Sequence, residues 1–363
     1  MLFPELDTPE VLLDLDALER NIGRMADIAK DANLKLRPHI KTHKSPDIAK
    51  LQLEAGATGI TVAKLGEAEV MVEHGVDDIL VAYPLVGERK LERLARLHQK
   101  AKLIVSTDSV ACAKGYHRVG AEAGKPLDVY IEVDTGLERC GHKPGRETVE
   151  IVKQMRDLSG IRIRGVMTHE GHAWLTTEPF ERERILRETS TALADTATQL
   201  RALGFPCFEV SIGSTPTAFH ARAAIGATEM RPGTYVFNDV SVIKHGVVML
   251  EDCAVTVLAT VVGHPAKNRV ILDVGSKTLS QDGAVTSDLK GLVLGKATWR
   301  LVKLTEEHAV VHVPENEAVV IGERVRLLPN HVCVVTNLVD QFVTVRGDKI
   351  SGTLNIEARG HTK

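Results

Sequence analysis

Aromatic residues and cysteines are scarce in this sequence, and both scarcities narrow the class of protein. Phe, Trp and Tyr make up 4% of the 363 residues, which argues against a surface that stacks nucleic-acid bases. The five cysteines are odd in number and lie far apart, at Cys112, Cys140, Cys207, Cys253 and Cys333. That pattern is typical of reduced thiols rather than of a disulfide framework, so it predicts a cytoplasmic protein.

Long runs of one kind of residue are also missing. The net charge is −3 and Lys and Arg form no basic block, so we expect neither nucleic acid nor a membrane surface as a partner. No stretch approaches the roughly 20 apolar residues that span a bilayer. The N-terminal segment has no basic stretch followed by an apolar one, so we predict no signal peptide.

Apolar runs alternate with amphipathic stretches from about residue 16 to residue 235. The predicted strands cover residues 34–40, 59–62, 79–83, 102–106, 127–133, 161–169, 207–212 and 228–232. Helical spacing of apolar residues predicts helices over 16–30, 46–56, 66–75, 88–98, 109–123, 146–157 and 179–203. Strands joined through helices are parallel, and eight such units predict a (β/α)8 TIM-type barrel of the α/β class. A doubly wound open sheet is the competing architecture.

The pattern changes after about residue 245. Strand-like segments separated by turns follow, with hardly any helical stretch, and they predict a C-terminal all-β domain. The segment 11–16, VLLDLD, is also strand-like and precedes the barrel, so we expect it to pair with that domain. The predicted domains are a barrel of residues 16–245 and a β-strand domain of residues 1–15 plus 246–363.

Polar and glycine-rich clusters follow the predicted barrel strands. They are RPHIKTHK with Lys41, DTGLERCG (134–141), THEGHAW (168–174), SIGSTPTA (211–218) and MRPGTYVFND (230–239). The active site of a (β/α)8 barrel lies at the C-terminal ends of its strands. These loops are therefore expected to supply one site together.

The segment SIGSTPTA is a candidate anion site. Gly213 allows close approach of the backbone, Ser214 and Thr215 offer hydroxyls, and the start of a helix offers free N–H groups. A simple Ser or Thr helix cap has the same sequence pattern. The position after the seventh barrel strand, where phosphate sites are common, favours phosphate.

Two further features carry little weight alone. Lys41 lies at a strand end among histidines and another lysine, and neighbouring cations help to lower a lysine pKa for Schiff-base chemistry. His331 and Cys333, in LLPNHVCVV, would lie on one face of a strand and can then bind one metal ion. A buried cysteine beside a hydrogen-bonded histidine is the alternative.

Motifs along nearly the whole chain together resemble those of one known protein family, although no single motif is specific for it. They are TPEVLLDLDALERNI, RPHIKTHK, DTGLERCG, GSTPTA, RPGTYVFND, LDVGSKTLSQD, TEEHA, PNHVC and the terminal ARG. Together they resemble the D-threonine aldolase and D-serine dehydratase family, within the fold-type III, alanine racemase-like enzymes that use pyridoxal 5′-phosphate (PLP).

The resemblance implies where PLP and a metal are held. Lys41 matches the lysine that carries PLP, and Arg139 is similar to the arginine that bonds the phenolic oxygen of the cofactor. The other cofactor contacts that we expect are Ser211, Gly213, Ser214, Thr215 and Tyr235. His331 and Cys333 match the ligands of a divalent metal (zinc, manganese or magnesium), and His172 resembles the proposed catalytic base.

The family includes two reactions of β-hydroxy-D-amino acids. We favour the aldolase, which releases glycine and an aldehyde from substrates such as D-threonine, because THEGHAW lacks the tyrosines of the dehydratase relatives. The H-x-C pair favours the alternative, a dehydratase of D-serine or D-3-hydroxyaspartate that gives a keto acid and ammonia. A racemase, a non-catalytic PLP carrier and a PLP-free barrel hydrolase are further alternatives. The resemblance also implies a homodimer.

Overall fold

The computed structural model describes residues 2–284 and 287–363 and divides the chain into two compact units. The barrel unit comprises Arg24–Lys41, Pro46–Gly233 and Gly360–Lys363, and the sheet unit comprises the residues up to Gly23, Thr42–Ser45 and Thr234–Arg359. The domain ranges predicted above, which divide the chain at residue 245, stay predictions.

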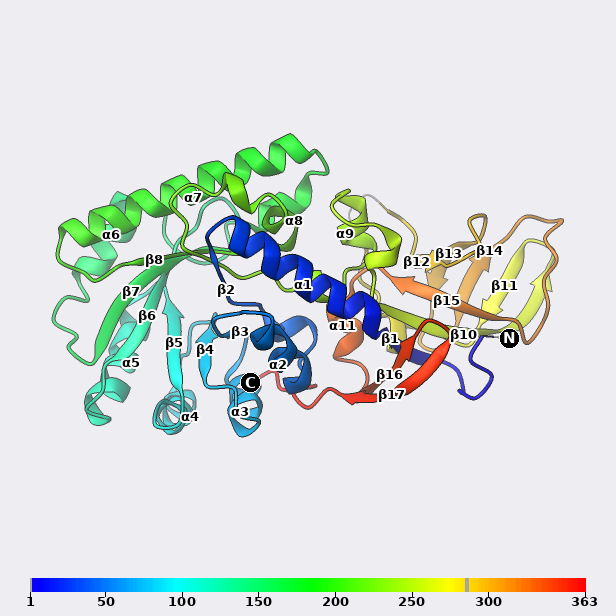
Figure 1. Ribbon diagram of the computed structural model, residues 1–363, viewed down its shortest axis with the longest axis horizontal. Coiled ribbons are helices and arrows are strands. Elements are labelled where there is room, and N and C mark those ends of the chain that lie inside the picture. The colour runs from blue at the N-terminus through cyan, green and yellow to red at the C-terminus, as the bar shows by residue number, and fades with distance from the viewer. Residues whose placement is uncertain (1, 285–286) are drawn as a thin grey trace. The chain divides into compact units, whose positions relative to one another are not determined.

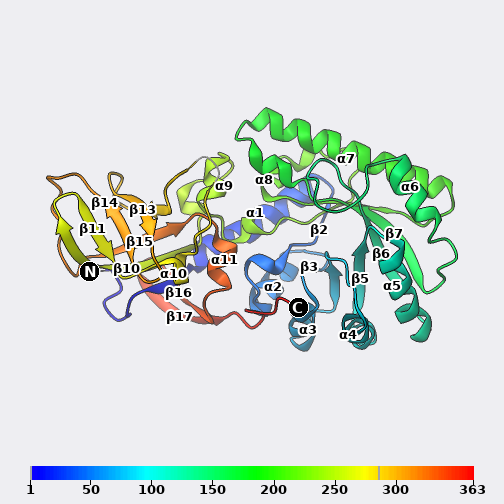
Figure 2. The ribbon, with the colours of Figure 1, turned by 180° about the vertical axis from the view of Figure 1, so that it is seen from behind.

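Eight parallel strands form the barrel unit (Figures 1 and 2). In pairing order they are β2 (Lys35–Leu36), β9 (Glu229–Met230), β8 (Glu209–Ile212), β7 (Ile161–Met167), β6 (Leu127–Glu132), β5 (Lys102–Thr107), β4 (Asp78–Val81) and β3 (Ile60–Val62). The first and last members meet, because the N–H groups of Thr58 and Thr61 donate to the carbonyls of Leu36 and Pro38, both at 2.8 Å. The predicted TIM-type fold is confirmed.

Helices precede or connect these strands, and α3 to α7 lie on the outer side of the sheet (Figure 1). They are α1 (Leu15–Asp31), α2 (Pro46–Glu54), α3 (Leu65–Glu73), α4 (Glu88–His98), α5 (Val110–Glu122), α6 (Arg146–Lys153), α7 (Pro179–Ala202) and α8 (Thr215–Ala218). In α4, Leu91, Leu94 and Leu97 recur at helical spacing and are buried. Burial of one apolar stripe explains why the spacing of apolar residues locates these helices.

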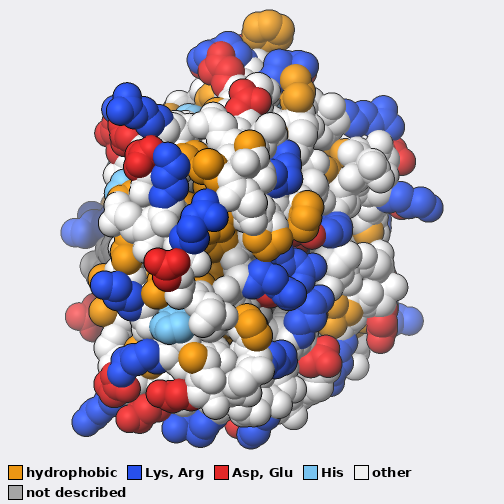
Figure 3. Space-filling model, turned by 90° about the vertical axis from the view of Figure 1, so that its left-hand side faces the viewer, with side chains coloured by type: hydrophobic (Ala, Val, Ile, Leu, Met, Phe, Trp, Pro, Cys, Tyr) orange, Lys and Arg blue, Asp and Glu red, His pale blue; other side chains and the backbone are white. Residues whose placement is uncertain are grey.

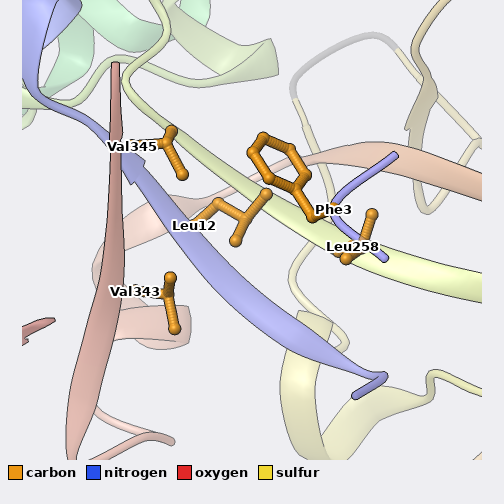
Figure 4. Close-up of a cluster of buried hydrophobic side chains, with 5 residues drawn as sticks. All are labelled: Phe3, Leu12, Leu258, Val343 and Val345. Carbon is orange, nitrogen blue, oxygen red and sulfur yellow. The ribbon is translucent and has the colours of Figure 1, made fainter. Parts of the chain in front are cut away.

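Nine strands form the sheet unit in the part of it that the structure describes. They are β13 (Arg300–Leu304), β14 (Ala309–His312), β11 (Arg269–Leu272), β10 (Val255–Ala266), β1 (Glu10–Asp14), β16 (Gln341–Arg346) and β17 (Lys349–Asn355) in pairing order, with β15 (Arg324–Pro329) paired to β10 and to β12 (Gly291–Val293). The strand β1 pairs antiparallel with β10 and parallel with β16, which confirms the predicted pairing of the N-terminal segment. Leu12 of β1 contacts Leu258, Val343 and Val345 in a buried apolar cluster (Figure 4).

Short helices interrupt the sheet unit, where the sequence predicts hardly any. Within the predicted β-strand range they are α10 (Ser276–Leu279) and α11 (Val332–Thr336), and α9 (Val240–Lys244) lies just before that range. The strand β15 ends at Pro329, and His331 is the N-cap of α11. The prediction that His331 and Cys333 share one face of a strand is therefore wrong. The carboxylate of Asp239 accepts a hydrogen bond from the N–H of Val332, which satisfies one of the amides that a helix start leaves open.

Surface features of the described residues agree with the charge pattern of the sequence. No helix in residues 2–284 and 287–363 combines the length and the apolar character needed to cross a membrane. The helix α7 carries ion pairs on its exposed side, such as Arg184 with Glu181 and Glu188. Figure 3 shows basic and acidic side chains interspersed over the left-hand side of Figure 1. All five cysteines are free.

Candidate active site

The loops after β2 and β6 place two of the predicted cofactor residues. Lys41 lies in a short 3-10 helix, Ile40–Thr42, and its side chain is exposed. In the loop after β6, Arg139 forms an ion pair with Glu132, with 3.9 Å between Nη2 and Oε1. Asp134 shapes that loop, because its Oδ1 accepts the N–H groups of Gly136 and Glu138, each at 3.0 Å.

Two consecutive residues after β7 hold Gly213 from both sides. Nδ1 of His169 donates a hydrogen bond to the carbonyl of Gly213. The next residue, Glu170, is fully buried, and its Oε2 accepts the N–H of Gly213 at 3.0 Å. Its other oxygen, Oε1, accepts the hydroxyl of Thr217 at 2.7 Å. The orientation of the peptide groups around Gly213 is therefore set by the loop after β7.

The predicted anion cradle, Gly213 to Thr215, contains a buried polar atom that suits an anion. The hydroxyl of Ser214 is buried and has no hydrogen-bond partner among the described residues, at the start of α8. A Cβ atom at Gly213 would lie only 3.0 Å from the Cβ of Arg231, so a larger residue there would crowd Arg231. Because the Gly213 amide is engaged by Glu170, the groups that remain for an anion belong to Ser214 and Thr215. This donor set fits a phosphate.

The imidazole of His169 is neutral. Burial lowers its pKa to about 3, and the positive charges of Lys41 and Arg139 act in the same direction. Since Nδ1 is the donor to Gly213, Nε2 carries the lone pair. Sequence reasoning missed this residue, although THEGHAW contains it. Its position directly after a strand is the signal that would have identified it.

His172, the predicted base, contacts the loop after β6. Its Nδ1 is buried and has no hydrogen-bond partner among the described residues. A Cβ atom at Gly136 would lie 3.3 Å from Cε1 of this ring, and Gly136 has a φ of +130°, so only glycine suits that position. The imidazole is therefore held against the DTG segment with an available nitrogen.

Ser211, another predicted cofactor contact, lies in a buried network of charged groups. Its hydroxyl donates to Oε1 of Glu229 at 2.5 Å and accepts a hydrogen bond from Nη1 of Arg231. Glu229 also accepts from Arg37, with 2.7 Å between Oε2 and Nε. Ser211 thus orients Arg231, and its contact with a cofactor stays a prediction.

The two predicted metal ligands lie together in the sheet unit. The imidazole of His331 is hydrogen-bonded to Cys333, and this bond is the main cause that raises the pKa of His331 to about 10. Asp282 holds the ring from the other side, with 2.7 Å between its Oδ2 and Nδ1 of His331. Sγ of Cys333 lies 3.3 Å from Oγ1 of Thr42 and 3.7 Å from Oγ1 of Thr234.

This pair fits a metal site with only two protein ligands. Because Nδ1 of His331 is taken by Asp282, Nε2 is the ring nitrogen that remains for coordination beside the Cys333 thiolate. Among the described residues, no group of three His, Cys, Asp or Glu side chains could hold a metal ion. A metal bound here would therefore keep positions open for other ligands, as catalytic sites do. Tyr235, the last predicted cofactor residue, is buried in the 3-10 helix Thr234–Val236 of the same unit.

Comparison with known proteins gives matches over most of the chain. Residues 13–240 match the alanine racemase N-terminal domain, and residues 254–345 match a putative serine dehydratase domain. The chain is 36% identical to D-threo-3-hydroxyaspartate dehydratase of Delftia sp., over 90% of this chain and 91% of that protein. It is 33% identical to D-threonine aldolase of Arthrobacter sp., over 99% of this chain and 94% of that protein.

A solved structure provides a further comparison. It is a D-threo-3-hydroxyaspartate dehydratase in which a cysteine is replaced by alanine, in the metal-free form. The TM-score is 0.88 at 33% sequence identity, and the match covers 98% of this chain and 99% of that one. Both units of the chain thus have the fold of known enzymes.

Proposed function

Since the chain belongs to the D-threonine aldolase and D-serine dehydratase family of fold-type III PLP-dependent enzymes and is a lyase, we propose that it cleaves β-hydroxy-D-amino acids to glycine and an aldehyde. The observation that carries this choice is the imidazole of His172, whose Nδ1 is buried without a partner among the described residues. A general base must keep such a nitrogen available for the proton that it removes.

Residues of the barrel unit are proposed to hold PLP. Lys41 would bind it covalently, and Ser214 and Thr215 would bind its phosphate. The unpartnered hydroxyl of Ser214 supports this assignment, because a buried hydroxyl without a partner is unfavourable unless a ligand satisfies it. Arg139, Ser211 and Tyr235 complete the proposed cofactor contacts, and Gly213 would contribute the close approach of its backbone, since its amide bonds to Glu170.

The metal is proposed to bind His331 and Cys333. Their mutual hydrogen bond supports a common ligand position. A related dehydratase in which a cysteine is replaced by alanine is known in a metal-free form. A thiolate beside an imidazole favours zinc, with manganese or magnesium as alternatives.

The proposed role of each group follows from which proton it removes or stabilises. When bound, PLP provides an electron sink for negative charge at Cα, and a divalent metal lowers the pKa of a β-hydroxyl. His172 would accept the hydroxyl proton, after which the Cα–Cβ bond breaks and the aldehyde leaves. Cα then takes up a proton, which gives glycine. His169 cannot supply a proton near neutral pH, because burial keeps its pKa at about 3.

Dehydration is the second candidate, and a specific observation favours it. The H-x-C pair accompanies 36% identity to a D-threo-3-hydroxyaspartate dehydratase. In that reaction a base, for which Lys41 is the candidate, removes the Cα proton and the β-hydroxyl leaves. The residues that hold PLP and metal are the same in both proposals, and only the bond that breaks differs.

One assay separates these candidates. The purified protein with PLP is given D-threonine, D-serine and D-threo-3-hydroxyaspartate, with and without EDTA, and glycine plus aldehyde is measured against keto acid plus ammonia. Glycine and aldehyde that disappear with EDTA are the expected result. Keto acid and ammonia would establish the dehydratase, and L-threonine serves as the stereochemical control.

The remaining alternatives give other results in the same assay. A racemase would release neither set of products, and a carrier would bind PLP without turnover. A PLP-free hydrolase would show no cofactor absorbance. The homodimer and the cytoplasmic location stay predictions, for sedimentation and localisation experiments.

A further inference from the structure

We propose that Glu170 is a positioning residue that sets the phosphate cradle from the neighbouring loop. This inference rests on the proposed function, since it concerns how PLP is held at Ser214 and Thr215. Glu170 belongs to the loop after β7, yet both of its carboxylate oxygens bond to the segment after β8. It is fully buried, so water does not compete for these bonds.

The two hydrogen bonds of Glu170 hold the cradle at Gly213, where it begins, and at Thr217, in the short helix α8 that follows. Oε2 accepts the N–H of Gly213 at 3.0 Å, immediately before Ser214 in the chain. Oε1 accepts the hydroxyl of Thr217 at 2.7 Å, and this hydroxyl lies 3.1 Å from the carbonyl of Ser214. The backbone of Ser214 is thus held between two anchored points, and its unpartnered hydroxyl takes its direction from them.

The negative charge of Glu170 does not explain why a carboxylate lies beside the proposed phosphate cradle. A negative group beside a phosphate site repels the phosphate, so Glu170 must act through the geometry of its hydrogen bonds. The nearby guanidinium of Arg231, itself buried, offsets the negative charge. A neutral group with the same shape is therefore expected to replace Glu170 without loss.

Glutamine meets that requirement and alanine does not. In Glu170→Gln, the amide oxygen accepts the Gly213 N–H and the amide nitrogen donates to Thr217, whose proton turns to the Ser214 carbonyl. In Glu170→Ala, the N–H of Gly213 loses its partner and the cradle is free to shift. The pair of variants separates hydrogen bonding from charge.

The experiment compares PLP with pyridoxal, which lacks the phosphate. Apo forms of the full-length wild type, Glu170→Ala and Glu170→Gln are titrated with each compound, and the ratio of the two dissociation constants is the readout. We expect Glu170→Ala to weaken PLP by about tenfold and pyridoxal by less than about threefold, since one oriented buried hydrogen bond is lost. Glu170→Gln is expected to keep the wild-type ratio.

Two further variants keep the test decisive. Thr217→Val removes one anchor and keeps the side-chain shape, so it should change the ratio in the same direction by a smaller factor even if Glu170→Ala folds poorly. Glu178→Ala, at an N-cap without a side-chain cap bond, is the control for loss of a carboxylate and should match the wild type.

The outcomes distinguish the inference from the proposed function. Equal weakening of PLP and pyridoxal in Glu170→Ala and Thr217→Val would make Glu170 a structural residue only and overturn the inference. If Glu170→Gln changes the ratio of the two dissociation constants as much as Glu170→Ala does, the negative charge matters. That result would also overturn the inference. If the wild-type protein binds no PLP, the proposed function is overturned, and so is the assignment of Ser214 and Thr215 to the PLP phosphate.

Discussion

Replacement of Asp282 tests how the proposed metal site is held. Its Oδ2 lies 2.7 Å from Nδ1 of His331, so the carboxylate fixes which ring nitrogen carries the proton and how the ring is turned. Without it, the imidazole can rotate and its Nε2 must be reoriented when metal binds. We therefore expect Asp282→Ala to weaken zinc binding.

The size of this effect follows from the exposure of the two side chains. Partners of metal-bound histidines typically change metal affinity by about 10- to 100-fold. The His331 and Asp282 side chains are 41% and 47% exposed, so water competes for the bond and the lower end of the range applies. We expect a loss of about tenfold, or about 1.4 kcal/mol. Asp282→Asn keeps an acceptor oxygen and should lose less.

The assay is a competition between the metal-free protein and a chromophoric chelator for zinc. Asp288→Asn, on the same loop and exposed, is the matched control and should bind as the wild type does. His331→Ala gives the affinity that remains when the ligand itself is lost. An Asp282→Ala protein with unchanged zinc affinity would refute the reasoning, because the ring would then be oriented by Cys333 alone.

Four other changes test the remaining assignments. Lys41→Ala should abolish turnover and the visible absorbance of bound PLP, and retained activity would remove the central residue of the site. His172→Asn should lower kcat by about 100-fold or more with unchanged PLP affinity, measured by steady-state kinetics and PLP titration. Ser211→Ala should lower the free energy of unfolding by about 2 kcal/mol in urea, because two buried charged groups each lose a partner. Burial raises the pKa of Cys207 to about 12, so this thiol should resist alkylation until the protein unfolds, as mass spectrometry would report.

The barrel was predictable because its elements are locally encoded. Helix 88–98 was expected from its leucine spacing and is found at Glu88–His98. Segment 102–106, rich in β-branched residues, is found as β5, Lys102–Thr107, whose residues are buried except the first. Each parallel strand lies in the protein interior, so a short apolar run between two amphipathic helices was a sufficient signal.

The fold around His331 and Cys333 was not predictable in the same way. LLPNHVCVV has the apolar, β-branched character of a strand, but the chain turns into a helix after Pro329. The turn depends on Asp239, which lies far away in the sequence and caps the N–H of Val332. No local pattern contains that contact. The two side chains still meet, because His331 is the N-cap of α11 and its extended backbone places its side chain beside the first helical turn, where Cys333 lies.

His169 and Glu170 were missed for a related reason. His169 contributes through Gly213, and Glu170 contributes through Gly213 and Thr217, all in the segment after β8. Neither residue belongs to a spaced pattern. Composition and periodicity report which residues are buried, but not which loop a buried polar group holds. Only the packed barrel brings the loop after β7 against the loop after β8.

The segment Thr168–His172 contacts several parts of the proposed site. Oγ1 of Thr168 lies 2.9 Å from that of Thr135 after β6, His169 and Glu170 hold the cradle after β8, and the ring of His172 lies against the DTG segment. We therefore expect a substitution in this segment to shift the proposed base, the proposed phosphate cradle and the DTG loop together. We therefore expect the choice between breaking the Cα–Cβ bond and expelling the hydroxyl to depend on the joint geometry of these groups. Overall identities of 36% to a dehydratase and 33% to an aldolase do not decide between the two reactions.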